Sequence, residues 1–306
     1  MAHIPDGFLS GTVMVGTAIA SGAALAVAAR RSRRDLAERE APILGAVTAF
    51  VFASQMLNFP IGAGTSVHLL GGVLVGAIVG PWSGMLVLFA VLLVQALLFQ
   101  DGGIASLGAN TLNLSIISVG AGVLLYRWFL ALVGVGDRRR VGAAAVAAFL
   151  STVLVGGAVA VELAASGTIP IKPALVVVGG GHILVGVVEA VLTGAILATL
   201  LRVRPELVTV SAGARPVSRP LALGVAGVTA LLAMAAGYVA STRPDVLEAA
   251  ASRLGLAQQE SVGATPFGDY GAPASGAWAA ALIGVVVVFG LGWVVVRLLA
   301  RGRLRA

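Results

Sequence analysis

The feature that most constrains this chain is a series of long apolar stretches joined by short polar connections. Hydrophobic residues make up 58% of the sequence and charged residues only 11%. A soluble domain carries about 25% charged residues, so this chain lacks the charge to cover itself with a hydrated surface. Because the apolar stretches are continuous rather than alternating, they argue against a membrane β-barrel. The sequence predicts an all-α fold, a polytopic membrane helical bundle.

The lengths of the apolar stretches predict how often the chain crosses the membrane. A spanning helix needs about 20 mostly apolar residues, which predicts about nine transmembrane segments. Two stretches are short, so half-helices or tilted helices are alternatives for them. The expected segments run over about 9–29, 42–57, 67–80, 82–99, 111–133, 141–164, 174–201, 220–240 and 275–299.

The basic residues predict the orientation of the chain. They gather after alternate apolar stretches, and by the positive-inside rule such clusters lie in the cytoplasm. We therefore expect a multi-pass protein of the plasma membrane with an external N-terminus and a cytoplasmic C-terminus. The first apolar stretch is expected to be retained rather than cleaved as a signal peptide, because its positive charge follows it. The residues outside the clusters are Lys172, Arg243 and Arg253.

The same pattern divides the chain into two predicted modules. A seven-span module covers about 1–205, and a cytoplasmic linker covers 206–219. A two-span accessory module covers 220–306 and carries a polar external loop over 241–274. We expect this loop to lie on the same side of the membrane as the N-terminus.

Several classes of chemistry have no matching motif in the sequence. Cysteine is absent, which removes thiolate ligands and disulfides. The single lysine, Lys172, precedes Pro173, so the chain has no P-loop, and ATP-driven work would need a separate ATPase subunit. Neither HExxH nor GxSxG occurs. We expect a protein that is not an enzyme, holds no tight organic cofactor, contacts membrane lipid and does not bind nucleic acid.

The N-terminus offers a candidate metal-ligand set. Removal of Met1 before the small residue Ala2 would leave a chain that starts Ala2-His3. Its free amine, the His3 amide nitrogen and the His3 imidazole are three nitrogen donors that close fused chelate rings, an arrangement suited to Ni²⁺ or Cu²⁺. The alternative is an incidental histidine on a frayed terminus.

His68 is the natural fourth nitrogen donor. It closes the loop NFPIGAGTSVH (58–68), which we expect on the same side of the membrane as His3. Asn58 and Ser66 of this loop are candidates to orient the site by hydrogen bonds. The alternative for His68 is an interfacial histidine with its polar tip in water.

Further polar residues lie near or within the expected spans. His182 and Glu189 are seven residues apart and so share one helix face. Ionisable groups in a membrane are usually functional, and these two could support the site, fix helix packing or handle ions directly. Gln95 and Asn110 could orient ligands or join helices. Gly72, Gly76 and Gly80 form a small-residue stripe suited to helix packing within the chain or against a partner.

Four stretches of the sequence are distinctive: MAHIPDGFLS (1–10), NFPIGAGTSVHLLGG (58–72), GPWSGMLVLFAVLLVQALLFQDGGIASLGANTLN (80–113) and GHILVGVVEAVLTG (181–194). Together they resemble the CbiM/NikM family, the substrate-specificity components of energy-coupling factor transporters for cobalt and nickel. The accessory module, with RPDVLE (243–248) and TPFGDYGAP (265–273), resembles the PDGLE or NikN-type domain, although it has PDVLE in place of PDGLE.

The resemblance implies a metal site and a set of partners. The metal would be bound by the terminal amine, by the amide and imidazole of the second residue, and by the histidine of the GTSxHLLGG motif. Here the imidazoles are those of His3 and His68, and Ala2 supplies the amine once Met1 is removed, since this chain begins Met-Ala-His rather than Met-His. The implied partners are a transmembrane coupling (T) protein and cytoplasmic ABC ATPase subunits.

The leading prediction is a membrane component that captures Co²⁺ or Ni²⁺ as transported substrate at the outer face. Nitrogen-rich sites bind both ions, so both stay as candidates. One alternative is a proton-coupled secondary carrier that uses His182 and Glu189 as its relay. The other is a non-transporting membrane scaffold.

Overall fold

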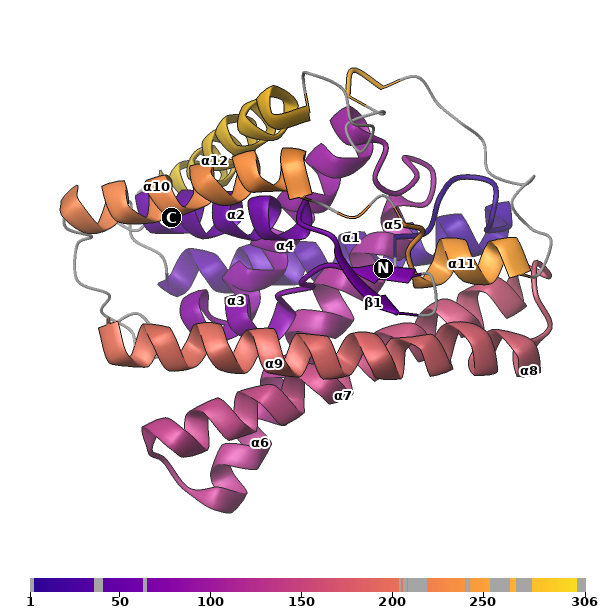
Figure 1. The fold of residues 1–306 in the computed structure, drawn as a ribbon, viewed down its shortest axis with the longest axis horizontal. Coiled ribbons are helices and arrows are strands. Elements are labelled where there is room, and N and C mark those ends of the chain that lie inside the picture. The colour runs from indigo at the N-terminus through magenta and orange to yellow at the C-terminus, as the bar shows by residue number, and fades with distance from the viewer. Residues whose placement is uncertain are drawn as a thin grey trace.

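The computed structural model of the chain is a bundle of helices, as predicted, with a single two-stranded hairpin among the residues that it describes (Figure 1). It describes residues 3–35, 41–62, 65–203, 205, 208, 219–239, 241, 243–253, 265–267 and 277–301. The predicted linker over 206–219 lies almost entirely outside the described residues, as does much of the loop over 241–274.

Within the described residues, six helical stretches are long and apolar enough to cross a membrane. Three are formed by the continuous helices α1 (Gly11–Asp35), α7 (Asp137–Ala165) and α12 (Ala277–Arg301). The outward faces of these stretches carry exposed aliphatic side chains such as Ile19, which is 67% exposed. Because the transfer of aliphatic side chains from water to hydrocarbon is favourable, these exposed side chains mark the lipid-facing surface of an integral membrane protein.

The other three long stretches contain wider π-type turns. The first is α4 (Pro81–Val94) with η2 (Gln95–Phe99). The second joins α5 (Leu107–Asn110), η3 (Thr111–Ala121) and α6 (Gly122–Val133), and the third joins α8 (Ile171–Ala174), η4 (Leu175–Gly179) and α9 (Gly180–Val203). Such turns often occur near functional sites.

The predicted count of nine spans is not confirmed. Two further apolar helical stretches are shorter. They are α2 (Ala41–Gln55) and Gly224–Ala236 within α10 (Arg219–Val239). The segment expected over 67–80 is a loop followed by α3 (Gly72–Val79), which has eight residues. At 1.5 Å per residue α3 is only about 12 Å long, against a hydrocarbon core of about 30 Å. It ends at Gly80, whose φ of +81° turns the chain before Pro81 begins α4.

Small residues let the helices pack closely. A Cβ on Gly72 would fall 1.9 Å from the Ser118 hydroxyl oxygen, and one on Gly76 would fall 2.2 Å from a Val123 methyl carbon. Two residues of the predicted stripe therefore pack inside this chain, against η3 and α6. The third, Gly80, has open space around its Cβ position.

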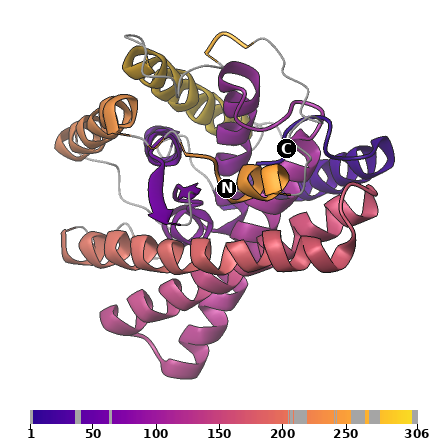
Figure 2. The same ribbon diagram turned by 45° about the vertical axis from the view of Figure 1, so that its right-hand side comes forward.

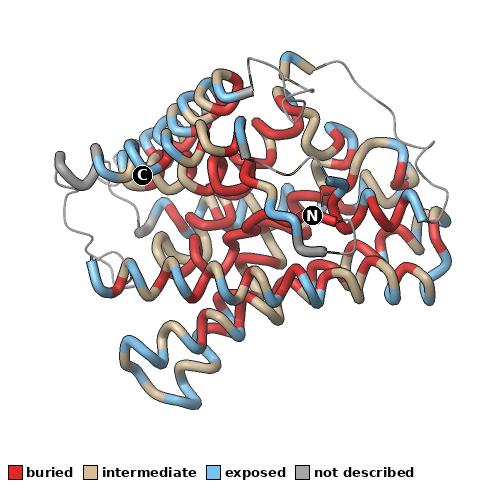
Figure 3. Tube along the Cα trace, viewed as in Figure 1, coloured by how far each residue is buried: buried red, intermediate tan, exposed pale blue. Residues whose placement is uncertain are grey.

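The accessory module packs along the first one rather than apart from it. Helices α10 and α12 both lie against α2, and a Cβ on Gly45 of α2 would fall 3.0 Å from the Phe289 carbonyl oxygen of α12. Helix α11 (Val246–Arg253), which lies between α10 and α12 in the sequence, packs beside Ile4, close to the N-terminal end of the chain (Figures 1 and 2). The buried residues gather around this region, whereas the outer helices are exposed on their far sides (Figure 3).

A small antiparallel hairpin follows α2, formed by β1 (Phe59–Gly62) and β2 (Thr65–Val67). The sequence analysis expected only a loop there. The hairpin delivers the chain to His68, the first residue after β2, and it thereby positions the site described next.

Candidate metal site

Three side chains from distant parts of the chain converge beside α11. His3 precedes α1, His68 follows β2, and Asp101 follows η2. One potential ligand atom from each lies within 4.8 Å of those of the other two. The His3 and His68 rings have centroids 5.4 Å apart at an angle of 48°. The structure thus places the two predicted imidazoles side by side, while Ala2, the predicted amine donor, lies outside the described residues.

The His68 imidazole is held in one tautomer. Its Nδ1 lies 2.8 Å from the Leu69 carbonyl oxygen, which can only accept a hydrogen bond, so Nδ1 carries the proton. Burial, helped by the neighbouring His3 ring, lowers the pKa of His68 to about 3. The ring is therefore neutral near pH 7, and the lone pair of its Nε2 is available to a metal.

Asp101 supplies an anionic oxygen that the sequence analysis did not single out. Burial by itself raises the pKa of this carboxyl, but the adjacent His3 and His68 imidazoles outweigh that effect and hold the pKa below its ordinary value. One carboxylate oxygen accepts a hydrogen bond from His3 Nδ1. The signal that could have found Asp101 is its place in the predicted external loop QDGGIASLGAN (100–110), where it is the single acidic residue.

Each of the three residues also has a buried polar atom without a hydrogen-bond partner among the described residues. These atoms are His3 Nε2, His68 Nε2 and Asp101 Oδ2. Orphaned buried polar atoms are costly and rare, so three in one cluster point to a ligand that would satisfy them. The set of two imidazole nitrogens and one carboxylate oxygen suits a divalent first-row transition metal.

The N-terminal segment is firmly attached, contrary to the alternative of a frayed terminus. The side chain of Asn110, one of the predicted supporting residues, accepts from the Ile4 N–H at 2.7 Å and donates to the Ile4 carbonyl at 3.0 Å. The Asp6 carboxylate accepts from the Ser106 N–H at 2.9 Å. His3, only 4% exposed, is thereby tied to the loop that carries Asp101.

A second group of polar residues forms hydrogen bonds to the backbone of Leu70 and Gly71, just after His68. The Glu189 carboxylate accepts hydrogen bonds from the N–H groups of Leu70 and Gly71, both at 2.8 Å. Gln55 donates to the Leu70 carbonyl at 3.0 Å, and Gln95 donates to Gln55 at 3.0 Å. Glu189 and Gln95 therefore contact the backbone that carries His68 directly or through one neighbour, and they do not enter the cluster itself.

Three other predicted supporting residues lie elsewhere. His182 is fully buried, its Nδ1 donates to the Val178 carbonyl of its own helix at 2.7 Å, and its ring packs on Gly156 of α7. Ser66 and Asn58 instead contact the accessory module: the Ser66 hydroxyl donates to the Arg243 carbonyl at 2.7 Å, and the Asn58 carbonyl accepts from the Ser241 N–H at 2.9 Å.

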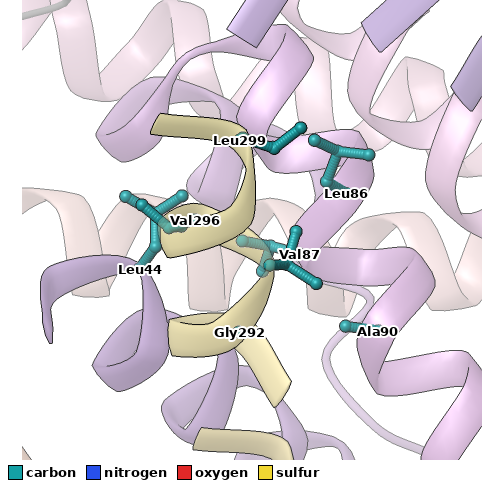
Figure 4. A pocket seen from close by; sticks show the side chains of 8 residues that line it. Leu44, Leu86, Val87, Ala90, Gly292, Val296 and Leu299 are labelled. Carbon is teal, nitrogen blue, oxygen red and sulfur yellow. The ribbon is translucent and has the colours of Figure 1, made fainter. Parts of the chain in front are cut away.

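A pocket in another part of the molecule has no ligand groups. It lies between α2, α4 and α12 and is lined by aliphatic side chains and one glycine (Figure 4). Such a crevice offers nothing to a metal ion, so the candidate site is the buried cluster and not this pocket.

The chain is similar to known families and proteins over most of its length. Residues 3–207 match the family model described as "Cobalt uptake substrate-specific transmembrane region", CbiM. A putative fused nickel transport protein NikMN of Archaeoglobus fulgidus is 33% identical over 302 residues, which cover 96% of this chain and 98% of that protein.

Two further similarities agree with this match. The cobalt transport protein CbiM of Geobacter sulfurreducens is 30% identical over 221 residues, covering 67% of this chain and 61% of that protein. A crystal structure of a truncated transition metal transporter is 31% identical, with a TM-score of 0.59, and the alignment covers 65% of this chain and 98% of that one.

Proposed function

The chain belongs to the CbiM/NikM family of cobalt and nickel transport proteins, with a NikN-type part fused behind the CbiM-like region, and on this premise we propose that it is the metal-binding membrane component of an ATP-driven energy-coupling factor importer. The substrate is Co²⁺ or Ni²⁺, captured from outside. The observation that carries the proposal is the buried cluster of His3, His68 and Asp101, whose potential ligand atoms lie within 4.8 Å of one another and in which His68 Nε2 has no partner among the described residues.

The metal ligands we propose are the amine of Ala2 after removal of Met1, the amide and imidazole nitrogens of His3, and Nε2 of His68. A ring that contains the His3 amide nitrogen, Cα, Cβ, Cγ, Nδ1 and the metal has six members, so Nδ1 is the imidazole atom that closes the chelate. In the metal-free protein this atom donates to Asp101. Metal binding would require the His3 imidazole to change tautomer, with its proton moving from Nδ1 to Nε2, because a ligand nitrogen needs its lone pair. For the same reason the Ala2 ammonium and the His3 amide would each lose one proton to solvent.

Asp101 then has two successive roles in this proposal. Before binding, its carboxylate orients the His3 ring through the Nδ1–H hydrogen bond. After binding, its negative charge lies beside the ion and compensates part of the added positive charge, which is costly to bury alone. A carboxylate that neighbours metal-binding imidazoles typically changes metal affinity by about 10- to 100-fold.

The energy source lies outside this chain in the proposal. The sequence has no P-loop, so a coupling (T) protein and ABC ATPase subunits would supply the ATP-driven step. The arginine clusters favour an external N-terminus and a cytoplasmic C-terminus. With that orientation, His3, His68 and Asp101 would lie at the outer side of the bundle. The module boundaries near 205 and 220 belong to the same proposal.

The carrier alternative, with His182 and Glu189 as a proton relay, receives less support. The two oxygens of Glu189 accept from the backbone at Leu70 and Gly71, and the His182 Nδ1 donates to its own helix. Both residues are thus already engaged in holding backbone and helices, and we assign Glu189 to positioning the His68 segment.

Metal titration of the purified protein with a native N-terminus tests the proposal. We expect one Ni²⁺ or Co²⁺ per chain by calorimetry and metal analysis, with N-terminal sequencing showing Ala2 as the first residue. A short Gly-Ser extension before Ala2 should abolish binding, whereas the same extension after Ala306 should not. Unchanged binding by the N-terminally extended protein would overturn the amine as a ligand, and no binding by the native protein would overturn the proposed function.

A further inference from the structure

In the accessory module, Ser241 and residues 243–253 form a segment that lies directly against the stretches carrying His3 and His68. We propose that this segment, α11 with the residues before it, is part of the metal site itself: it positions the His68 loop and closes the route between the cluster and the outside. The inference rests on the proposed function, because it takes His3, His68 and Asp101 as the place where metal binds.

The residues before α11 form hydrogen bonds to both ends of the His68 loop, residues 58–68. The Ser66 N–H donates to the Pro244 carbonyl at 2.9 Å, and the Ser66 hydroxyl donates to the Arg243 carbonyl at 2.7 Å. At the other end, the Ser241 N–H donates to the Asn58 carbonyl at 2.9 Å. Ser66 is two residues from His68, so this attachment constrains the backbone that presents the imidazole.

The apolar face of α11 packs against the segments that carry His3 and His68. Val246, Leu247, Ala250 and Ala251 are buried in one hydrophobic cluster with Ile4 and Val67, the neighbours in sequence of His3 and His68. Val246 also packs directly on Gly181 of α9. A Cβ at Gly181 would fall 2.3 Å from a Val246 methyl carbon, so this close contact needs glycine there. The helix therefore contacts both the ligand-bearing segments and the framework beneath them.

The PDVLE motif explains how a helix of only eight residues keeps its shape there. The Asp245 carboxylate accepts from the Glu248 N–H at 2.6 Å, and the Glu248 carboxylate accepts from the Asp245 N–H at 2.7 Å. This reciprocal arrangement is a capping box, which satisfies two otherwise unpaired N–H groups at a helix start. The motif thus stabilises the helix, and Val246 and Leu247 between its acids provide the docking contacts.

Phe267, in the second motif of the module, contacts the segment that carries Asp101. In TPFGDYGAP, the Phe267 N–H donates to the Leu98 carbonyl at 2.8 Å, and its ring centroid lies 5.4 Å from that of Phe99. Phe99 ends η2, two residues before Asp101. The described residues of both motifs therefore lie against segments that carry residues of the cluster.

Because His3 and His68 are buried, a metal ion can reach them only if part of the protein moves. His3 and His68 are 4% and 2% exposed, so a hydrated ion cannot reach them in the arrangement described. A segment that covers the cluster must leave before metal enters and return before the site is sealed, as lids do in other proteins. Metal binding and α11 docking are then coupled, since each favours the closed arrangement.

A disulfide lock can test this, because the chain has no cysteine of its own. A Cβ at Gly181 would lie 3.6 Å from the Val246 Cβ, within the range of about 3.5–4.5 Å that disulfides use. The matched control is the pair Ala145 and Gly194, whose Cβ positions are also 3.6 Å apart and which joins α7 to α9 without touching α11. The variants are Gly181→Cys with Val246→Cys, and Ala145→Cys with Gly194→Cys.

Each full-length variant is oxidised with a metal-free thiol oxidant, and Ni²⁺ uptake by the empty protein and loss to a chelator are then timed. We expect the 181–246 lock to slow both steps by at least about tenfold, with recovery after reduction by a phosphine, while the 145–194 lock changes neither step by more than about twofold. Complete crosslinking at 181–246 with unchanged rates would overturn the inference, and so would failure of that disulfide to form. Absence of metal binding in the reduced variants and in the unmodified protein would instead overturn the proposed function.

Discussion

Glu189, deep in α9, accepts a hydrogen bond from the backbone N–H of Leu70 at 2.8 Å, although the two residues are 119 positions apart. The second oxygen of the same carboxylate accepts from Gly71. A buried carboxylate that accepts two backbone N–H groups holds that backbone in one place. The helix that spans the bundle is thereby tied to the chain that presents His68.

Glu189→Gln tests this positioning role. The amide keeps one acceptor oxygen but turns an NH₂ group toward a backbone N–H, and an unsatisfied buried donor costs about 1–3 kcal/mol. We expect a lower thermal unfolding temperature in detergent, with metal affinity by calorimetry reduced by no more than about tenfold. Complete loss of binding with unchanged unfolding would contradict the assignment and would make Glu189 a ligand.

Asp101→Asn tests the charge beside the metal. The amide oxygen can still accept from His3 Nδ1, so the His3 ring keeps its orientation, but the negative charge is lost. We expect Ni²⁺ affinity to fall by about 10- to 100-fold. The control is Asp6→Asn, which removes the same charge from a carboxylate that accepts from the Ser106 backbone and should leave affinity within about threefold. Equal losses in the two variants would show a general effect of charge at the outer face rather than a role in the site.

The double variant His3→Ala with His68→Ala tests the cluster as a whole. Since the chain has no cysteine and Asp101 alone offers one carboxylate, we expect no measurable Ni²⁺ or Co²⁺ binding by calorimetry. His182→Ala removes the remaining histidine and is the control, expected to keep metal affinity within about tenfold while lowering stability, because its ring packs on Gly156. Retention of tight binding by the double variant would place the site elsewhere.

Gly72→Ala tests the close packing of α3. A methyl group there would fall 1.9 Å from the Ser118 hydroxyl oxygen and 2.8 Å from the Ser118 carbonyl carbon, so backbone must move. Overpacking of this kind costs about 1–3 kcal/mol of unfolding free energy. Gly16→Ala is the control, because its Cβ would meet no atom within 4 Å in the middle of α1, and we expect its unfolding temperature to be unchanged or higher. A Gly72→Ala protein as stable as Gly16→Ala would contradict the packing described here.

The errors of the sequence analysis have specific physical causes. The stretch over 67–80 has the composition of a span, but Gly71 and Gly80 adopt left-handed φ values of +79° and +81°, which limit the helix between them to eight residues. Asp101 was passed over because a lone acid in a glycine-rich loop is common. Its role is visible only where two histidines from other segments lie beside it.

The sequence by itself determined the membrane class and the helical fold, because apolar run length is a local property of the chain. It made His3 and His68 candidate ligands, because the chain has no cysteine and only three histidines. The pairing of His3 with His68 was a hypothesis that depended on both lying on one side of the membrane. Only the tertiary structure decided that Asp101 joins them, that Glu189 holds the backbone after His68, and that α11 packs against the sequence neighbours of both histidines. These are contacts between residues tens to more than a hundred positions apart, and composition and periodicity carry no information about which distant backbones meet.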